Sequence, residues 1–418
     1  MNKIDKYGLN IHIYLSCAIA FLIPTLPILL PIFIGLICIN WLFYIIKNGI
    51  SLKRIGHNNI AIAMIGFYLI NLLGLIITDQ SNMRYGWFMV EIKLSFILLP
   101  LVFLTSYSFS KHQLDMVLKS FLLGSVLSGT YHLVKVVVEV NTENLSAHHL
   151  FGKYFTAPLH LGYYAHYLVF AFLISYSFLI QTKSKTYQIL YGTSLALLPV
   201  FIFFTTSKAG IIGFFVVLTG ILIHWIKSKS SRKKILWSVS TLAIVMLALQ
   251  LTYNSKTALR FRTAYNSLVH TEISPSSSAS SQARLYAWKT ALSLFQNNII
   301  TGVGTGNLKT YTLNHYQQNG YIGVLKHKLN AHNQFFQTAA ATGFVGLIML
   351  LIIFWFILNY SVKYKSILLL GFGTIMFLFA FTESIFERQS GIIFFTFFAL
   401  LISQLKISKN DSILTTPN

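Results

Sequence analysis

One long hydrophilic segment, residues 253–331, interrupts a chain that otherwise alternates apolar stretches with short polar connections. Of the 418 residues, 55% are hydrophobic and only 10% are charged, whereas a soluble domain carries about 25% charged residues. Apolar stretches of about 20 residues are long enough to cross a bilayer as helices. The sequence therefore predicts an all-α polytopic membrane protein.

Twelve apolar stretches are predicted to span the membrane. They are residues 11–23, 27–46, 60–77, 87–105, 114–138, 160–180, 187–206, 209–226, 234–252, 333–359, 364–382 and 390–406. Pro24, Pro27 and Pro31 interrupt the first long apolar run, and proline disrupts a helix interior, so a tight hairpin is expected there. The expected organisation is a single transmembrane domain, 1–418, with 253–331 inserted as a helical loop between the ninth and tenth spans.

The distribution of basic residues predicts the orientation of these spans. With the N-terminus in the cytoplasm, the inner segments hold more than half of the 32 Lys and Arg residues, as the positive-inside rule expects. The long loop is exempt from that rule, because long loops are translocated largely regardless of charge. Both termini are then cytoplasmic, and the net charge of +22 reflects topology rather than binding of nucleic acid.

The long loop is strongly basic. It contains one acid, Glu272, and eight basic residues: Lys256, Arg260, Arg262, Arg284, Lys289, Lys309, Lys326 and Lys328. Binding of an anionic substrate and docking on anionic lipid headgroups both explain this charge. The loop should contain a helix over 282–296, whose apolar face is formed by Leu285, Trp288, Leu292 and Phe295 at three- and four-residue spacing.

Closely spaced glycines follow this predicted helix, in the segment Thr-Gly-Val-Gly-Thr-Gly-Asn at 301–307. Such a segment before a helix can bind an anion through its backbone N–H groups. A turn between two helices is the simpler interpretation, and we favour it. The segment is not a Walker loop, since Asn307 rather than a Lys-Ser/Thr pair directly follows the last glycine.

His332 and Lys208 stand where hydrophilic chain meets an apolar span. His332 precedes the span 333–359, with Asn330 as the expected N-cap. A helix N-terminus disfavours the imidazolium, and a neutral imidazole can accept a proton from a hydroxyl. Lys208 lies in the very short connection 205–210, where a cation is costly unless it meets an anion. The structural alternatives are an interfacial histidine without chemistry and a lysine that extends to the lipid headgroups.

A second histidine, His160, begins the sixth predicted span close to several tyrosines. Binding of sugar or phosphate and an interfacial aromatic belt both explain this composition. Glu383 and Glu387, four residues apart beside Arg388, either orient a substrate or pair with that arginine. No Asp-x-Asp occurs in the chain, and divalent ions need oxygen ligands such as carboxylates. We therefore expect no metal and no cofactor, with phosphate charge met by Arg and Lys.

These residues give the chain a resemblance to the O-antigen ligase family, which also contains Wzy-type polymerases and some protein O-oligosaccharyltransferases. Four short motifs occur in matching order: Thr-Ser-Lys-Ala-Gly at 206–210, Arg-Leu-Tyr-Ala-Trp at 284–288, Gly-Val-Gly-Thr-Gly at 302–306 and Ala-His-Asn-Gln-Phe at 331–335. Twelve spans with a large outer loop between the ninth and tenth also fit. The resemblance covers most of the chain and implies a GT-C-like fold.

The resemblance implies metal-independent transfer of a glycan from undecaprenyl diphosphate to an acceptor hydroxyl, at the periplasmic face of the bacterial inner membrane. It implies two catalytic residues, His332 as the base or acceptor-orienting group and Arg284 as a diphosphate ligand. Lys208 stands where the family usually has arginine; it keeps the charge but loses the bidentate fork. The implied partners are the lipid-linked glycan, a lipid A-core or other glycan acceptor, and membrane lipids.

Three other functions remain open at this stage. A Wzy-type polymerase or a protein O-oligosaccharyltransferase would share the donor chemistry, since only the acceptor differs. A transporter or flippase of lipid-linked sugars would need a polar path through the bilayer, yet the spans offer mainly Glu91, Lys93 and Lys135. No repeat relates the first six spans to the last six, although transporter folds often show one. Ligation of O-antigen onto lipid A-core is the leading hypothesis.

Overall fold

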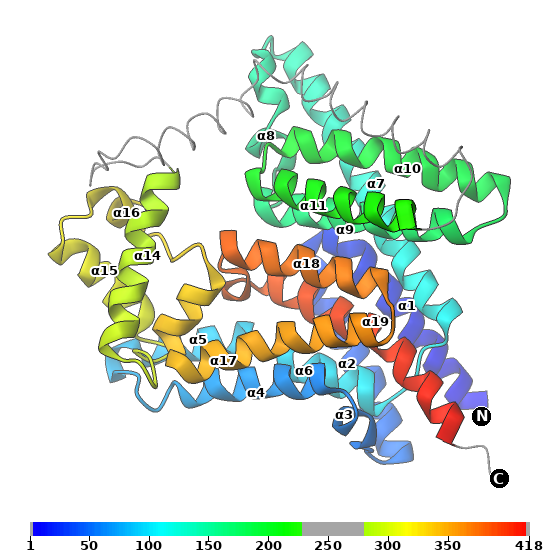
Figure 1. The fold of residues 1–418 in the computed structure, drawn as a ribbon, viewed down its shortest axis with the longest axis horizontal. Coiled ribbons are helices and arrows are strands. Elements are labelled where there is room, and N and C mark those ends of the chain that lie inside the picture. The colour runs from blue at the N-terminus through cyan, green and yellow to red at the C-terminus, as the bar shows by residue number, and fades with distance from the viewer. Residues whose placement is uncertain (1–2, 228–279, 415–418) are drawn as a thin grey trace. The chain divides into compact units, whose positions relative to one another are not determined.

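The chain is a helical, multi-pass membrane protein. The computed structural model describes residues 3–227 and 280–414, which form helices, turns and loops without a strand (Figure 1). Seven helices are long and apolar enough to cross a membrane: Asp5–Thr25, Pro27–Asn48, Gln80–Thr105, Lys111–Thr142, Leu161–Gln181, Lys185–Thr205 and Gln334–Lys363. Four shorter apolar helices are Asn59–Leu73, Lys208–His224, Ile367–Thr382 and Gln389–Gln404.

These helices coincide with eleven of the twelve predicted spans. The ninth predicted span, 234–252, lies outside the described residues, as do Arg260 and Arg262. The number twelve and the position of the whole loop therefore stay predictions. The proline hairpin is confirmed, because α1 (Lys3–Thr25) ends at a short 3-10 turn, η1 (Pro27–Leu29), before α2 (Leu30–Asn48) begins.

The chain divides into two compact units. Unit 1 comprises Met1–Ile13, Gly35–Leu114 and Ala264–Asn418, and unit 2 comprises Tyr14–Ile34 and Asp115–Thr263. Beside parts of α1 and α2, the described helices of unit 1 are α3 (Lys53–Gly56), α4 (Asn59–Leu73), η2 (Gln80–Asn82), α5 (Met83–Ile92), α6 (Ser95–Thr105), α14 (Ser280–Asn297), α15 (Leu308–Gln318), α16 (Ile322–Lys326), α17 (Gln334–Lys363), α18 (Ile367–Thr382), η4 (Ile385–Glu387) and α19 (Gln389–Leu414). Unit 2 holds most of α7 (Lys111–Thr142), with η3 (Ala147–Leu150), α8 (Lys153–Thr156), α9 (Leu161–Gln181), α10 (Lys185–Thr205) and α11 (Lys208–Lys227).

The fourth predicted span is not one continuous helix. It is divided into α5 and α6 at Lys93 and Leu94. The N–H groups of Lys93, Leu94 and Phe96 each bond to a carbonyl three residues earlier, and such tightened turns mark an irregularity within a helix. The side chain of Lys93 is only 2% exposed. The break therefore places a buried cation inside unit 1, where the apolar composition alone predicted an uninterrupted helix.

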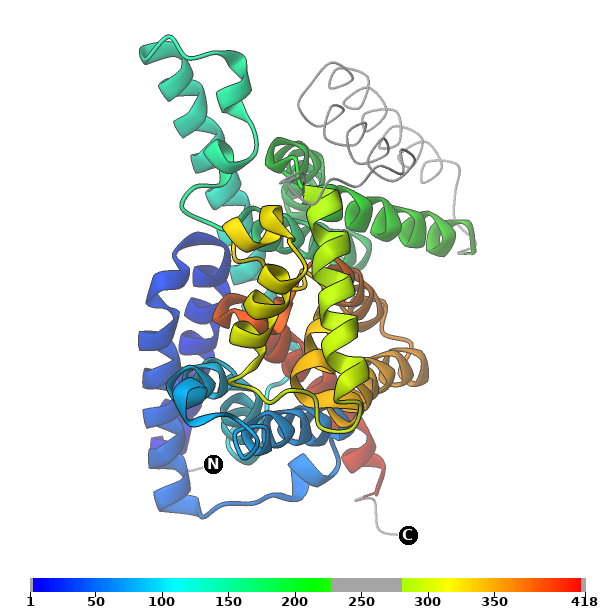
Figure 2. The same cartoon turned by 90° about the vertical axis from the view of Figure 1, so that its left-hand side faces the viewer.

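Helix α17 is the central element of unit 1 and packs along both α4 and α18 (Figure 1). Its first turns are rich in small side chains, and Ala339, Ala340 and Ala341 are all buried. Small side chains of this kind let neighbouring helices pack closely. The helices α14, α15 and α16 gather at the end of unit 1 where α17 begins (Figure 2).

The described part of the long loop folds against α17 through α14. The predicted helix is confirmed, but the residues of its expected apolar face are at most half-buried. The buried positions are instead Ala283, Tyr286, Ala287, Thr290, Ala291 and Leu294, which also repeat every three or four residues. Small residues let neighbouring helices approach closely, so they face inward while the large Leu292 stays 41% exposed. Tyr286 packs with Tyr316 and Val324, and Ala291 with Ala340 and Ala341.

The glycine segment after α14 connects to a kink in α17. At Gly343, α17 has a non-helical backbone with φ of 66°. Carbonyl groups near the kink therefore accept hydrogen bonds from outside the helix. Val303 N–H donates to Ala340 O (2.9 Å) and Gly304 N–H donates to Ala341 O (2.9 Å). The Phe344 N–H in turn donates to Ile299 O (2.7 Å). These exchanges fix the segment across the helix.

The same segment also binds the turn after α4. Thr305 N–H donates to Gly74 O (3.2 Å) and Gly306 N–H donates to Thr78 Oγ1 (3.1 Å). Asn307 accepts from the Asp79 N–H (3.0 Å) and is almost fully buried. The interpretation of this segment as a turn between helices is thus confirmed, and its N–H groups from Val303 to Gly306 are committed to the protein rather than to an anion.

Gly302 tests this connection. Its φ is +67°, and an added Cβ would lie 2.5 Å from the Ala341 carbonyl carbon and 2.6 Å from Gly343 N. Gly302→Ala should therefore cost about 1–3 kcal/mol from backbone strain, with crowding in addition. The melting temperature of purified protein in detergent measures the effect. Gly35→Ala is the matched control, since nothing lies within 4 Å of its added Cβ; equal melting temperatures for the two variants would contradict the packing described.

Candidate functional site

Two predicted catalytic residues converge on one carboxylate in unit 1. Arg284 Nη2 donates to Glu383 Oε1 (3.2 Å), and His332 Nδ1 lies 2.8 Å from Glu383 Oε2. The side chains of Arg284, His332 and Glu383 are 32%, 26% and 17% exposed. Each is thus partly buried but still open to a ligand. The three residues come from α14, the loop before α17 and the residue after α18, so only the tertiary fold brings them together.

Hydrogen bonds at Ala331 and His332 hold the loop that carries the histidine. His332 has a φ of +44°, which is uncommon for a residue other than glycine. Its N–H donates to Asn330 Oδ1 (3.0 Å). Ala331 is held on both sides: its N–H donates to Gln337 Oε1 (3.1 Å) and its carbonyl accepts from Trp288 Nε1 (2.9 Å). Such strain clusters at functional sites, where the surrounding structure maintains it.

The helix after His332 begins later than the sequence indicated. Asn333, not Asn330, is the N-cap of α17, and its side chain accepts from the N–H groups of Phe335 and Phe336. The prediction of Asn330 as the cap is therefore wrong. Both asparagines have a side-chain oxygen suited to capping, and the choice depends on the turn at His332, which the sequence does not display.

Three amide side chains near the start of α17 bind the segment that carries the carboxylates. Asn333 Nδ2 donates to Phe381 O (3.2 Å). Gln334 Oε1 accepts from the Phe386 N–H (2.7 Å). Gln337 Nε2 donates to Glu387 Oε2 (3.2 Å). Residues 381–387 are therefore held against the helix start at three points. This was missed at sequence level, although three amides within five residues at the start of an apolar span were a usable signal.

Arg284 and Trp288 reach the site from one face of α14. They are four residues apart, so their side chains lie on the same face of the helix. Arg284 contacts Glu383, and Trp288 holds the carbonyl of Ala331. The role of Trp288 as a donor was not predicted, because its spacing suggested only an apolar face.

The neighbouring carboxylate, Glu387, is paired elsewhere. Its Oε1 lies 3.1 Å from Lys93 Nζ. The sequence left open whether Glu383 and Glu387 orient a substrate or pair with Arg388. In the structure each carboxylate has a basic partner from another element, and Arg388 is exposed.

The contact with Glu383 determines which ring nitrogen of His332 carries the proton. An ionised carboxylate only accepts hydrogen bonds, so His332 Nδ1 carries the proton that faces Glu383. In the neutral ring, Nε2 is then the acceptor nitrogen. This arrangement would let Nε2 take a proton from a hydroxyl, and it places Glu383 where a carboxylate orients the ring and stabilises an imidazolium in other carboxylate–histidine pairs.

Lys208 and His160 belong to unit 2, and each stands at a helix N-terminus. Lys208 is the first residue of α11 and is half-buried. Before it, Thr206 is the C-cap of α10 and has a φ of +51°, and Ser207 Oγ accepts from the Gly210 N–H (3.2 Å). His160 occupies the N-cap position of α9 and is exposed. Helix N-termini favour anions.

Within residues 3–227 and 280–414, no cluster of three His, Cys, Asp or Glu side chains is arranged to hold a metal ion. The carboxylates of the site have basic or amide partners instead. Elsewhere in unit 1, the Tyr311 hydroxyl donates to Asp79 Oδ2 (3.1 Å), and this hydrogen bond raises the pKa of Tyr311. Metal independence stays a prediction.

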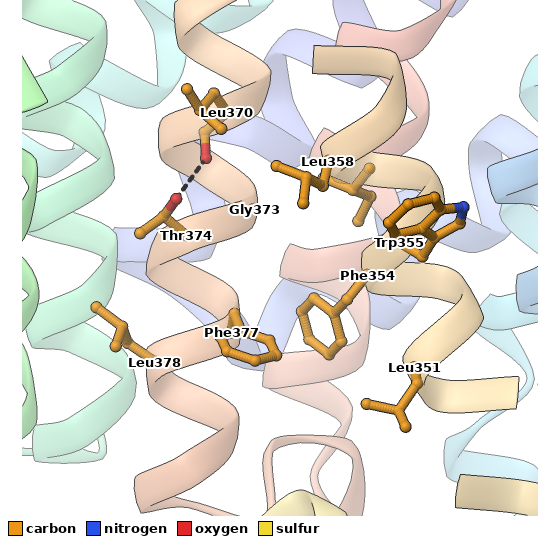
Figure 3. A pocket seen from close by; sticks show the side chains of 10 residues that line it. Leu351, Phe354, Trp355, Leu358, Leu370, Gly373, Thr374, Phe377 and Leu378 are labelled. Carbon is orange, nitrogen blue, oxygen red and sulfur yellow. Dashed lines mark hydrogen bonds between the residues drawn. The ribbon is translucent and has the colours of Figure 1, made fainter. Parts of the chain in front are cut away.

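An apolar groove of about 450 Å³ lies between α17 and α18 (Figure 3). Its only side-chain hydroxyl, on Thr374, donates to Leu370 O (2.9 Å). The lining contains no ionisable residue, so a phosphate would find no counter-charge there. The groove is therefore separate from the chemistry proposed for Arg284 and His332.

Comparison with known families agrees with the resemblance. The fold and the site together define a helical membrane protein whose polar site combines a carboxylate–histidine pair with an arginine. A family model described as O-antigen ligase matches residues 193–351. This part of the chain is therefore similar to the O-antigen ligase family, which supports the resemblance seen in the motifs. Comparison with curated proteins gave no match.

The matched region contains Lys208, Arg284 and His332, and it ends before Glu383. The family supports a ligase- or polymerase-type function on glycans. The carboxylate that joins Arg284 to His332 is thus seen only in the structure.

Proposed function

We propose that the protein is a metal-independent, inverting glycosyltransferase that moves a glycan from undecaprenyl diphosphate to an acceptor hydroxyl. The proposed reaction is ligation of O-antigen onto lipid A-core, at the periplasmic face of the inner membrane with both termini cytoplasmic. The observation that carries this proposal is the convergence of Arg284 and His332 on Glu383. A base and an anion ligand within one partly buried site are what such a transfer needs.

In the proposed reaction, His332 Nε2 accepts the proton of the acceptor hydroxyl while its oxygen attacks the anomeric carbon. The new bond forms from the face opposite the diphosphate, so the configuration inverts. Glu383 stabilises the imidazolium that develops, because its carboxylate is already 2.8 Å from Nδ1. General-base catalysis of this kind contributes typically 10²–10⁴-fold.

Arg284 is proposed to stabilise the departing diphosphate. Glu383 engages one terminal nitrogen, Nη2, and a guanidinium has five N–H donors in a fork that suits phosphate. Lys208, at the N-terminus of α11 in unit 2, is proposed to bind the diphosphate or the glycan. Arg260, Arg262, His160 and Arg388 are proposed to bind the diphosphate or glycan, and Glu383 to orient the acceptor through His332.

Purified protein in detergent, a lipid-diphosphate-linked glycan and a lipid A-core acceptor provide the direct test. Transfer should continue in EDTA. Loss of activity on chelation that Mg²⁺ or Mn²⁺ restores would contradict metal independence. If well-folded protein shows no transfer, the proposed activity is contradicted. Movement of the lipid-linked glycan across the membrane of vesicles that contain the protein would favour a flippase.

The lipopolysaccharide of a strain that lacks this protein identifies which acceptor the enzyme uses. Loss of a ligase leaves core-only lipopolysaccharide and accumulated lipid-linked polymer. Loss of a polymerase leaves cores capped by one repeat, and loss of a protein glycosyltransferase leaves lipopolysaccharide unchanged. A gel of the lipopolysaccharide therefore separates ligation from the two alternatives within the family.

His332→Ala should abolish detectable transfer, because no other group would accept the proton at that position. The initial rate of transfer in detergent measures this. His327→Ala is the matched control, since His327 is exposed and lies in the same loop. A His332→Ala protein that transfers at nearly the wild-type rate would exclude the role as base.

Arg284→Ala should lower turnover by roughly 10²–10³, the usual loss when one donor to a developing anion is removed. Arg284→Lys should recover only part of it, because the bidentate geometry is lost. Lys289→Ala on the exposed side of α14 serves as the control for a lost positive charge. Wild-type turnover in Arg284→Lys would show that charge alone suffices.

Lys208→Ala should impair transfer and raise the donor concentration needed for half-maximal rate, whereas Lys208→Arg should keep or improve activity. The reason is that a phosphate contact needs the cation, while a lysine that only extends to the headgroups can be lost at little cost. Rates at several donor concentrations decide between the two. Full activity with unchanged donor dependence in Lys208→Ala would leave Lys208 with a structural role.

A further inference from the structure

A buried ion pair in unit 1 joins elements that are far apart in sequence. Lys93 Nζ and Glu387 Oε1 are 3.1 Å apart, with side-chain exposures of 2% and 14%. Lys93 comes from the break between α5 and α6, and Glu387 from the loop after α18. A buried charge within a membrane span is costly unless it is paired, and it usually has a function.

The second carboxylate oxygen of Glu387 is connected to the residue before His332 by two hydrogen bonds of one glutamine. Gln337 Nε2 donates to Glu387 Oε2 (3.2 Å), and Gln337 Oε1 accepts from the Ala331 N–H (3.1 Å). Because Gln337 has only one side-chain oxygen and one NH₂ group, its bond to Glu387 sets which end faces Ala331. Ala331 directly precedes His332, whose backbone has the positive φ.

The same loop also places Glu383, the other partner of His332. Glu383 lies just before the short turn η4 and Glu387 is the last residue of that turn, so a shift of Glu387 moves both the carboxylate and the backbone that hold the imidazole. Lys93 is thus connected to His332 by two routes, one through Gln337 and Ala331 and one through the Glu383–Glu387 loop.

We infer that Lys93 is a positioning residue for His332, acting through Glu387 and Gln337. This inference rests on the proposed function for its effect on turnover, but the geometry can be tested without it. Lys93 touches neither Arg284 nor His332 in the contacts described, so its effect is to hold the ring in place rather than to take part in the reaction.

Lys93→Met should lower kcat by roughly 10- to 100-fold with a smaller change in the donor KM, because a small misplacement of a catalytic group costs about that much. Removing one partner of a buried pair also destabilises the fold. The double variant Lys93→Met/Glu387→Leu removes both charges and should recover much of the melting temperature, but not kcat. Gln337→Leu leaves the ion pair intact and should still lower kcat.

The control is Lys135→Met, which removes another lysine of a span; its pair with Glu139 is 3.7 Å long, with side chains 32% and 42% exposed. It should leave kcat unchanged. The positioning role is overturned if kcat returns together with the melting temperature in the double variant, or if Gln337→Leu turns over as the wild type does. Either result would reduce the pair to a support of the fold.

Labelling of His332 by diethyl pyrocarbonate, followed by mass spectrometry, separates this inference from the proposed function. The ring should be labelled faster in Lys93→Met and in Gln337→Leu, because it is no longer held against Glu383. Unchanged labelling in both variants would overturn the positioning role. If His332→Ala keeps full transfer activity, the proposed function fails, and the labelling result still decides whether Lys93 positions the ring.

Discussion

The site depends on the two contacts that the carboxylate oxygens of Glu383 make with Arg284 and His332. One oxygen holds Arg284 and the other holds His332, so a single carboxylate sets the distance between an anion ligand and a base. Because Glu383 lies directly after α18, the position of that helix against α17 determines the geometry of the site. The packing of the membrane helices is therefore part of the proposed chemistry.

The long loop becomes part of the site through its connections to α17. The kink at Gly343 removes helical partners from nearby carbonyls, and the glycine segment supplies N–H groups to them. Without a Cβ at Gly302 and Gly343, the two backbones come close enough for these bonds. This contact fixes the end of α14, and with it Arg284 and Trp288. The glycines thus serve the site by packing, while the proposed anion ligands are side chains.

The sequence predicted the elements better than their faces and ends. Eleven apolar helices and the helix of the long loop stand where hydropathy and periodicity placed them, because these signals depend on local composition. The periodicity of large apolar residues did not indicate which face of α14 is buried. Alanines, which permit close approach, are buried there, while the larger Leu292 is exposed. The N-cap of α17 and the break at Lys93 were also missed, because each depends on contacts with distant residues.

The amino-acid sequence by itself determined the membrane class, the helical spans and the residue types able to act, because the bilayer and the helix period constrain composition directly. The motifs at Lys208, Arg284 and His332 also indicated the family. Only the tertiary structure decided that Glu383 joins Arg284 to His332, and that Glu387 pairs with Lys93. Carboxylates four residues apart look alike in sequence; their different partners come from α14, α17 and the break between α5 and α6, which are brought together only by folding.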